Sequence, residues 1–437
     1  MLKNNFCSSP WFHIRIDPTG RFIPCRWSSH NNSSHNIADT SISEFMNSDV
    51  MDSIRGRMLD GASQKMCSAC YYEDQHNKVS GRQKQLLKSA IDINNFDKTF
   101  CSSPHWGKFE YSANRAGKTN HQPIDLQIDL GNTCNSSCIM CSPTYSSKLS
   151  AEYPKLIAIE PALFKQHKLS KNWADDPVLV DKFVAELSAI PDIKYIHFLG
   201  GETLYLKSFY TICNRLIDSD LAKNISIGTT TNCTVYTAEL EYIIRNFKNV
   251  HLGLSVEAIH SINDYIRYPS TIDQVSANIT RFLQLREQYN VQISLRITPN
   301  IFSIYHLDTV FSMMLKEQII AESCNILHDP SCLRIEVLPK NLIDQCLVKI
   351  NQVIQKYQLV ENNQTIINQR TELLIKPVIT QIIFEYKQFL ETYTVPDNVE
   401  EERYALIRYI KAFEQVHNNS ILDYLPEYEE FLRSYGY

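Results

Sequence analysis

The chain has 437 residues, with 43 Lys and Arg against 48 Asp and Glu, which gives a formal net charge of −5. This mildly acidic balance argues against a general electrostatic grip on nucleic acid or anionic lipid, so we expect no nucleic acid and no membrane as partners. A hydrophobic share of 43% excludes a mainly disordered chain. Residues 1–12 hold no apolar signal core and no apolar run approaches about 20 residues, so we expect a soluble, cytoplasmic protein.

Two residue counts bear on the chemistry. Cysteine is common, at 13 residues, whereas glycine is scarce, at 12 residues, well below its usual share of about 7%. In a long chain with no export signal, cysteines at short spacings indicate metal ligation rather than disulfides.

The first 115 residues contain a predicted β-hairpin. Residues 12–16 alternate apolar and polar side chains, Pro18-Thr19-Gly20 is typical of a turn, and Phe22 and Ile23 continue the apolar pattern.

Cysteines surround this hairpin in the sequence. Cys7 precedes it, Cys25 follows it, and Cys67-Ser-Ala-Cys70 comes later. Four thiolates are enough to close an iron–sulfur cluster or a zinc site, and their spacing leaves both open. Cys101 is either a fifth ligand or a free buried thiol, and we expect the latter.

The middle of the chain alternates predicted strands and helices. Between the strands, apolar residues recur at helical spacing, for example in 180–187 and 279–285. This alternation predicts a parallel α/β sheet, and six units are too few for a closed eight-stranded barrel, so we predict a partial (β/α)6 barrel. The strands are predicted at 124–130, 193–199, 225–231, 250–256, 291–298 and 333–338.

Five of the glycines lie in or just after these strands. In α/β folds a backbone without side chains at the strand ends lets a ligand come close. Tight turns are the alternative, above all for the last two positions of the set. The set is Gly131, Gly200, Gly201, Gly228 and Gly253.

A three-cysteine loop directly follows the first of these strands. It reads Cys134-Asn-Ser-Ser-Cys138-Ile-Met-Cys141. Three thiolate ligands on a four-iron cluster leave one iron open to bind a substrate or cofactor. Zinc and buried free thiols are the alternatives.

After Pro339 the sequence is almost wholly helical, with apolar stripes and a break at residues 396–398 before a last pair of helices. We therefore expect three parts, which are a cysteine-rich domain at 1–115, the barrel at 116–340 and a helical region at 341–437.

The CxxxCxxC loop after the first strand of a partial barrel resembles the radical S-adenosylmethionine (radical SAM) superfamily. The resemblance implies a [4Fe–4S] cluster on Cys134, Cys138 and Cys141, with S-adenosylmethionine at the open iron. It further implies reductive cleavage to a 5′-deoxyadenosyl radical, which abstracts a hydrogen from the substrate. An electron donor such as a flavodoxin or ferredoxin is implied as a partner.

Polar residues at successive strand ends continue this resemblance. The Gly-Gly-Glu motif is expected to take the amino group of S-adenosylmethionine, Asn232 or Glu257 to bond the ribose hydroxyls, and Arg267 to pair with the carboxylate. Met140 replaces an aromatic residue often found near the adenine, and Asn300 is expected to cap a loop. The cofactor-binding set is Met140, Gly200, Gly201, Glu202, Asn232, Ser255, Glu257 and Arg267.

The N-terminal cysteines resemble the twitch or SPASM domains of radical SAM enzymes, which carry auxiliary clusters. Only four cysteines fit, so the resemblance implies one auxiliary [4Fe–4S] cluster on Cys7, Cys25, Cys67 and Cys70. These domains usually follow the barrel, whereas this one precedes it.

Enzymes of this type often modify ribosomally made peptides by crosslinking, epimerisation or oxidation, and a peptide substrate is our first hypothesis. The alternatives are a small-molecule dehydrogenase or rearrangement enzyme, and a non-catalytic iron–sulfur or zinc protein. Cys233, at a strand end, is a speculative hydrogen donor to a substrate radical, with simple packing as the expected alternative.

Overall fold

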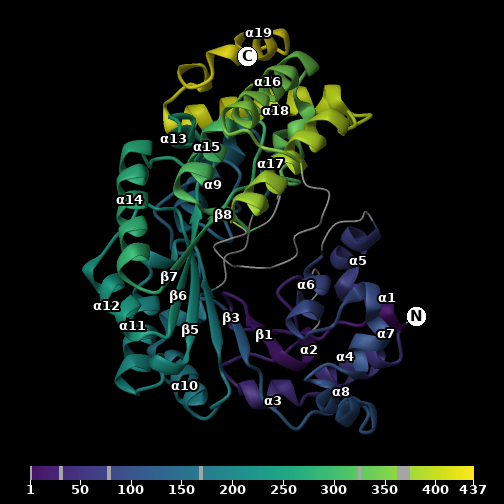
Figure 1. The fold of residues 1–437 in the computed structure, drawn as a ribbon. Helices are drawn as coiled ribbons and strands as arrows, with labels where there is room; N and C mark the ends of the chain where they lie inside the picture. The colour runs from purple at the N-terminus through teal and green to yellow at the C-terminus, as the bar shows by residue number, and fades with distance from the viewer. Residues whose placement is uncertain (1, 29–32, 76–79, 167–170, 323–325, 362–374) are drawn as a thin grey trace.

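The computed structural model describes residues 2–28, 33–75, 80–166, 171–322, 326–361 and 375–437. Within them, one sheet of eight strands forms the centre of the molecule (Figure 1). The strand order is β2-β1-β3-β4-β5-β6-β7-β8, and only the β1–β2 pair is antiparallel. The strands are β1 (His13–Ile16), β2 (Phe22–Ile23), β3 (Asp125–Asp129), β4 (Tyr195–Leu199), β5 (Ser226–Thr231), β6 (Asn249–Ser255), β7 (Val291–Arg296) and β8 (Ile320–Ala321).

Alternating side chains divide this sheet into two faces. Apolar residues such as Ile128, Phe198 and Leu252 are fully buried, and Phe198 meets Phe209 of helix α11 (Lys207–Asp218) edge to face, with ring centres 5.4 Å apart. A covering layer of helices explains why these strands are so apolar on one face. The parallel α/β partial barrel is thereby confirmed.

The helices of the barrel connect successive strands and lie mainly on that apolar face (Figure 1). They are α9 (Ser147–Ile159), η3 (Trp173–Asp175), α10 (Pro177–Ser188), η4 (Thr203–Tyr205), α11 (Lys207–Asp218), η5 (Ala222–Asn224), α12 (Ala238–Asn246), α13 (Ile262–Ile266), α14 (Ile272–Gln288), η6 (Ile304–His306) and α15 (Leu307–Glu317).

The prediction of a strand at 333–338 is wrong. This segment forms two short 3-10 turns, η7 (Ser331–Leu333) and η8 (Ile335–Val337), with Leu333 and Val337 fully buried. A short apolar run satisfies a buried turn as well as a strand, and periodicity does not distinguish them. The sixth barrel strand is β8, which pairs with β7 through Ser294–Ile320 and Leu295–Ala321.

The predicted N-terminal hairpin is confirmed, and it extends the barrel sheet because β1 pairs in parallel with β3. Its turn is fixed by the Asp17 carboxylate, which accepts from the Thr19 and Arg21 N–H groups at 2.8 and 3.1 Å. Gly20 has φ +86°, a backbone conformation that favours glycine.

Helices make up most of the rest of this N-terminal domain. They are α1 (Leu2–Asn5), α2 (Ser9–Phe12), α3 (Ile42–Met46), α4 (Asp49–Leu59), η1 (Lys65–Cys67), α5 (Ser68–Gln75), α6 (Gly81–Lys88), η2 (Ile93–Asn95), α7 (Phe96–Cys101) and α8 (Trp106–Ala113).

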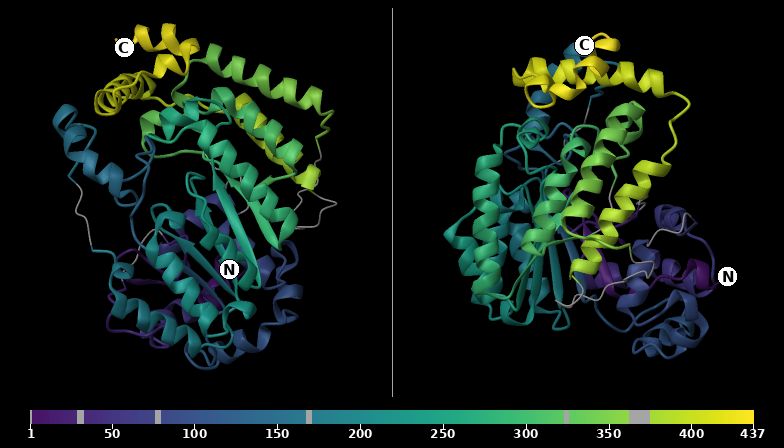
Figure 2. Two further views of the ribbon diagram at one scale, coloured as in Figure 1. Left: turned by 90° about the vertical axis from the view of Figure 1, so that its left-hand side faces the viewer. Right: turned by 45° about the horizontal axis from the view of Figure 1, so that its top comes forward.

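The C-terminal region is helical, as predicted, and its last helices lie across one end of the barrel (Figure 2). No helix in the described ranges is long and apolar enough to cross a membrane. The C-terminal elements are α16 (Lys340–Lys356), α17 (Ile375–Thr392), α18 (Val399–His417), η10 (Ile421–Asp423), η11 (Pro426–Tyr428) and α19 (Glu429–Ser434).

Candidate active site

The three-cysteine loop runs from the end of β3 to the start of α9. Two hydrogen bonds fix its first cysteine. The Cys134 N–H donates to Ser147 Oγ at 3.1 Å, and Cys134 Sγ accepts from the Ser136 N–H at 3.4 Å. Burial and the neighbouring Cys138 raise the pKa of Cys134 to about 12, and burial and the other two thiols do the same for Cys141. Both shifts show that Cys138 lies close to Cys134 and Cys141, and a bound metal centre would deprotonate the three thiols.

The middle cysteine faces a buried arginine. Ser137 and Ile139 donate their N–H groups to the carbonyls of Tyr268 and Ile266, at 2.7 and 2.9 Å. This pairing sets Cys138 opposite Arg267, whose Nη1 lies 3.8 Å from the sulfur.

Arg267 also links two further predicted residues. Its Nη2 donates to Ser255 Oγ at 2.7 Å and to Glu257 Oε1 at 2.6 Å, while the Thr298 N–H donates to Glu257 Oε2 at 3.0 Å. Arg267 Nε is buried and has no partner among the described residues. A buried, unpaired guanidinium N–H beside the three-cysteine loop suits an anionic ligand group such as a carboxylate.

The Gly-Gly-Glu motif connects the end of β4 to the start of the three-cysteine loop, called the cluster loop below because it is the predicted cluster site. The Gly201 N–H donates to the Gly131 carbonyl at 2.9 Å, and the Glu202 N–H donates to the Thr133 carbonyl at 3.0 Å. A Cβ on Gly201 would lie 2.4 Å from the Thr133 oxygen and 2.6 Å from the Asn132 oxygen. Glycine is therefore required by the close approach of two backbones.

Glu202 is buried and accepts two backbone bonds. The Asn232 N–H donates to its Oε2 at 2.6 Å and the Leu204 N–H to its Oε1 at 3.1 Å. Burial raises the pKa of Glu202, and these bonds oppose the shift. The Asn232 side chain in turn donates to Asn135 Oδ1 and Ser136 Oγ, each at 3.0 Å.

The tertiary structure thus brings the predicted cofactor residues to one edge of the sheet, around the cysteine loop. Met140 belongs to the same group, because Asn300 Nδ2 lies 3.2 Å from its sulfur. Asn300 also caps its own loop by accepting from the Phe302 N–H at 3.0 Å, as predicted. Cys233 is fully buried, with φ +62° and its sulfur 3.7 Å from the Thr231 carbonyl, which favours packing over hydrogen donation.

The four N-terminal cysteines line one small cavity, which Trp27 and Arg82 also contact. Burial raises the pKa of Cys67 to about 12 and of Cys70 to about 11, and in both cases nearby Cys25 adds to the shift. In the part of the chain that the structure describes, no three His, Cys, Asp or Glu side chains are arranged to hold a metal ion. The four thiols are distributed around this cavity.

Cys101 does not belong to this cavity. It forms no disulfide, and the prediction that it is buried is wrong, because the residue is exposed at the end of α7.

The inner face of the barrel sheet is polar, which was not predicted. The strand register aligns Arg15, Gln127, His197, Gly228 and His251 in one row. No role was predicted for these two histidines. The signal that could have found them is the alternation of polar and apolar residues along each strand.

Side chains on this face contact one another. Tyr195 Oη lies 3.0 Å from His197 Nδ1, and His251 Nε2 lies 2.8 Å from Ser294 Oγ. Arg296 pairs with Glu322 at 2.6 Å.

Two glycines of this face are in strands rather than turns. A Cβ on Gly228 would lie 2.0 Å from Tyr195 Oη, and one on Gly253 would lie 2.9 Å from Arg296 Nε. The glycines therefore leave room for the side chains of neighbouring strands.

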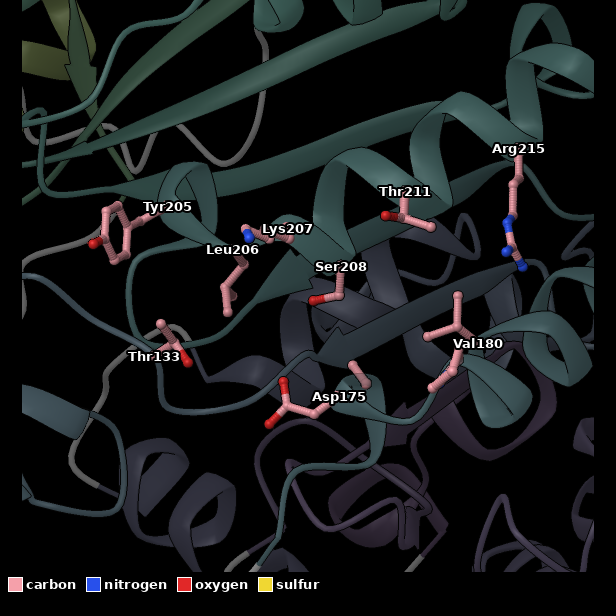
Figure 3. Close-up of a pocket in the computed structure, with 11 residues that line it drawn as sticks. Thr133, Asp175, Val180, Tyr205, Leu206, Lys207, Ser208, Thr211 and Arg215 are labelled. Atoms are coloured by element: carbon pink, nitrogen blue, oxygen red, sulfur yellow. The ribbon is translucent and has the colours of Figure 1, made fainter.

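An open cavity of about 540 Å³ lies on the outside of the barrel, between the η3–α10 segment and the start of α11 (Figure 3). Thr133, Lys207 and Arg215 are among its lining residues. None of the predicted site residues lines it, although Thr133 directly precedes Cys134.

Two family models match the chain. The family described as the radical SAM superfamily matches residues 128–292, and the SPASM family, an iron–sulfur cluster-binding domain, matches residues 7–71. Two solved structures of SuiB from Streptococcus suis are similar at 12% identity and a TM-score of 0.35. The match to SuiB bound to the precursor peptide SuiA covers 79% of this chain and 69% of the SuiB chain. The match to SuiB bound to S-adenosylmethionine covers 83% of this chain and 75% of the SuiB chain. No curated protein sequence matches the chain. The chain therefore carries a radical SAM domain with a SPASM domain ahead of it, and it is an enzyme whose cofactors are a [4Fe–4S] cluster, S-adenosylmethionine and auxiliary iron–sulfur clusters on the SPASM domain.

Proposed function

We propose that Cys134, Cys138 and Cys141 hold the [4Fe–4S] cluster with its open iron. The shared loop, the proximity of the three thiols and the guanidinium beside Cys138 support this assignment. When bound, the cluster and S-adenosylmethionine supply one-electron cleavage and a carbon radical. An external electron donor, such as a flavodoxin or ferredoxin, would reduce the cluster.

The protein side chains around this centre would bind and orient S-adenosylmethionine. Arg267 would pair with its carboxylate, while Ser255 holds the guanidinium in place. Glu202 would accept from its ammonium group, and Glu257 or Asn232 would bond its ribose hydroxyls. Burial of these groups keeps water away from the reactive centre.

Cys7, Cys25, Cys67 and Cys70 would hold one auxiliary [4Fe–4S] cluster. The observation that supports this assignment is that the four thiols line one cavity, although they come from three separate parts of the domain, with Cys67 and Cys70 in the same part. Such a cluster can accept the electron that remains on a substrate radical, which would make the net reaction oxidative.

The substrate would be a peptide that lies along the polar inner face of the sheet. The observation that carries this proposal is the extent of that face, whose row of aligned positions runs from Arg15 of β1 to Gln292 of β7. Six strands spaced about 4.8 Å apart span about 24 Å, the length of about seven extended residues. This is far longer than one small metabolite requires.

The metal assignment is tested by measuring iron and sulfide after anaerobic purification. We expect about eight irons per chain in the wild type, and about four in either a Cys134/Cys138/Cys141→Ala variant or a Cys67/Cys70→Ala variant. About four irons and one zinc in the wild type would oppose the auxiliary cluster, and a zinc-only protein would oppose the radical chemistry.

The substrate assignment is tested with synthetic peptides encoded by short reading frames beside this gene. The reconstituted enzyme, S-adenosylmethionine and a reductant should change the mass of one peptide, and the Cys134/Cys138/Cys141→Ala variant should not. Turnover of a metabolite without any peptide would refute the assignment and favour a small-molecule enzyme.

A further inference from the structure

The last long helix of the chain contacts both sequence neighbours of Cys138. Tyr409 Oη donates to the Ile139 carbonyl at 2.7 Å. Eight residues later, His417 Nε2 lies 3.4 Å from Ser137 Oγ. Both side chains belong to α18, which is more than 260 residues away from the loop in the sequence.

Glu152 of α9 completes the contact to Ser137. It accepts from the Ser137 hydroxyl and lies 3.1 Å from His417 Nε2. Since Ser137 is fully buried, water cannot replace these partners when one is lost.

The same helix also contacts the segment that pairs with the cysteine loop. The His417 ring stacks on the Tyr268 ring at 4.1 Å with an interplanar angle of 14°. Tyr268 is the residue after Arg267, and its carbonyl accepts the Ser137 N–H. One histidine therefore contacts both sides of the backbone pairing that sets Arg267 opposite Cys138.

Buried aromatic packing surrounds these two side chains. Tyr409 and His417 are 5% and 6% exposed, and Phe413 lies between them with ring-centre distances of 5.1 and 5.4 Å. A helix that only covered the end of the barrel would need apolar contacts but no hydrogen bonds to the loop backbone.

We propose that α18 is a clamp on the cluster loop, in which Tyr409 and His417 are positioning residues that hold Cys138 opposite Arg267. The clamp makes cluster retention and the electronic environment of the cluster depend on the C-terminal region. This inference rests on the proposed function for the identity of the cluster, although the clamp itself is a property of the polypeptide.

The variants are Tyr409→Phe and His417→Gln, with Tyr404→Phe as the matched control. Tyr404 belongs to the same helix and is 56% exposed. The first measurement is the alkylation rate of Cys138 in the metal-free full chain, resolved by peptide mass spectrometry. Fully buried Cys213 of α11 reports global opening in the same sample.

We expect Tyr409→Phe and His417→Gln to speed the alkylation of Cys138 relative to Cys213 by about five- to thirty-fold, because each removes one buried hydrogen-bonding partner. In the reconstituted protein, both variants should lose iron faster to a chelator and alter the electron paramagnetic resonance signal of the reduced cluster. Tyr404→Phe should match the wild type in all three measurements.

Cys138 alkylation that stays at the Tyr404→Phe level in both clamp variants would overturn the proposal. So would equal acceleration of Cys138 and Cys213, since that indicates global destabilisation. A wild type that binds no iron on this loop would instead refute the proposed function, while the alkylation ratio would still report on the clamp.

Discussion

The substitution Gly201→Ala tests whether the junction of β4 with the cluster loop needs a glycine. The added Cβ would lie 2.4 Å from the Thr133 carbonyl oxygen, and ordinary contacts begin at about 3.4 Å, so one backbone must move by about 1 Å. That displacement would break the bonds from the N–H groups of Gly201 and Glu202 to the Gly131 and Thr133 carbonyls.

The magnitude follows from these two effects. Each lost backbone hydrogen bond costs about 1 kcal/mol, and the overpacking adds about 1–3 kcal/mol. We therefore expect Gly201→Ala to lower the free energy of unfolding by about 3–5 kcal/mol. Because Thr133 directly precedes Cys134, the variant should also lose iron from the first cluster.

The assay is urea unfolding of the metal-free protein, followed by circular dichroism, with iron content measured after reconstitution. Gly56→Ala and Gly107→Ala are matched controls, because both glycines are in helices and a Cβ on either meets nothing within 4 Å. These controls should be neutral or stabilising by up to about 1 kcal/mol. A Gly201→Ala protein as stable and as rich in iron as the controls would refute the reasoning.

Three further substitutions test other parts of the site. Arg267→Leu removes the ion-pair partner of the buried Glu257 carboxylate, so it should destabilise the protein by about 3–5 kcal/mol. It should also abolish binding of S-adenosylmethionine in equilibrium dialysis. The double variant Arg267→Leu/Glu257→Leu should lose less stability than Arg267→Leu alone, and equal losses of stability would contradict the pairing. In Gly228→Ala the added Cβ would lie 2.0 Å from the Tyr195 hydroxyl and displace it, so the variant should lose stability and its peptide turnover should fall at least about tenfold. The double variant Gly228→Ala/Tyr195→Ala should recover the lost stability. Unchanged turnover in Gly228→Ala would argue against the inner face as the substrate site. Burial alone would raise the pKa of Asp125, but neighbouring basic side chains outweigh it and hold that pKa well below its usual range. This carboxylate therefore stabilises the fold above its unfolded pKa of about 4 and loses that contribution as the pH falls; Asp125→Asn should flatten the loss of stability between about pH 4 and pH 2, and an unchanged acid limb would refute this.

The metal-binding chemistry of this protein could be predicted from the sequence where the candidate ligands lie close together along the chain. Three cysteines within eight residues can reach one cluster from a single loop, whatever the rest of the fold does. The strands were equally readable, because alternating apolar residues and intervening helical periodicity are local patterns. The exception at 333–338 arose because a short apolar run fits a buried turn as well as a strand.

Contacts between distant segments were not readable. Nothing in the sequence placed His251 beside Ser294 on the polar face, since that required the parallel register of β6 against β7. The exposure of Cys101 likewise depended on where the end of α7 lies in the N-terminal domain.

The sequence by itself determined the residues available for cluster chemistry and the α/β pattern that carries them, because both are written in local spacing. Only the tertiary structure decided that β1 joins the barrel sheet, that Arg267 faces Cys138, and that Tyr409 of α18 holds the cluster loop. Each of these contacts joins segments more than 100 residues apart. Their partners are selected by packing and by the need to satisfy buried polar groups, which no local pattern encodes.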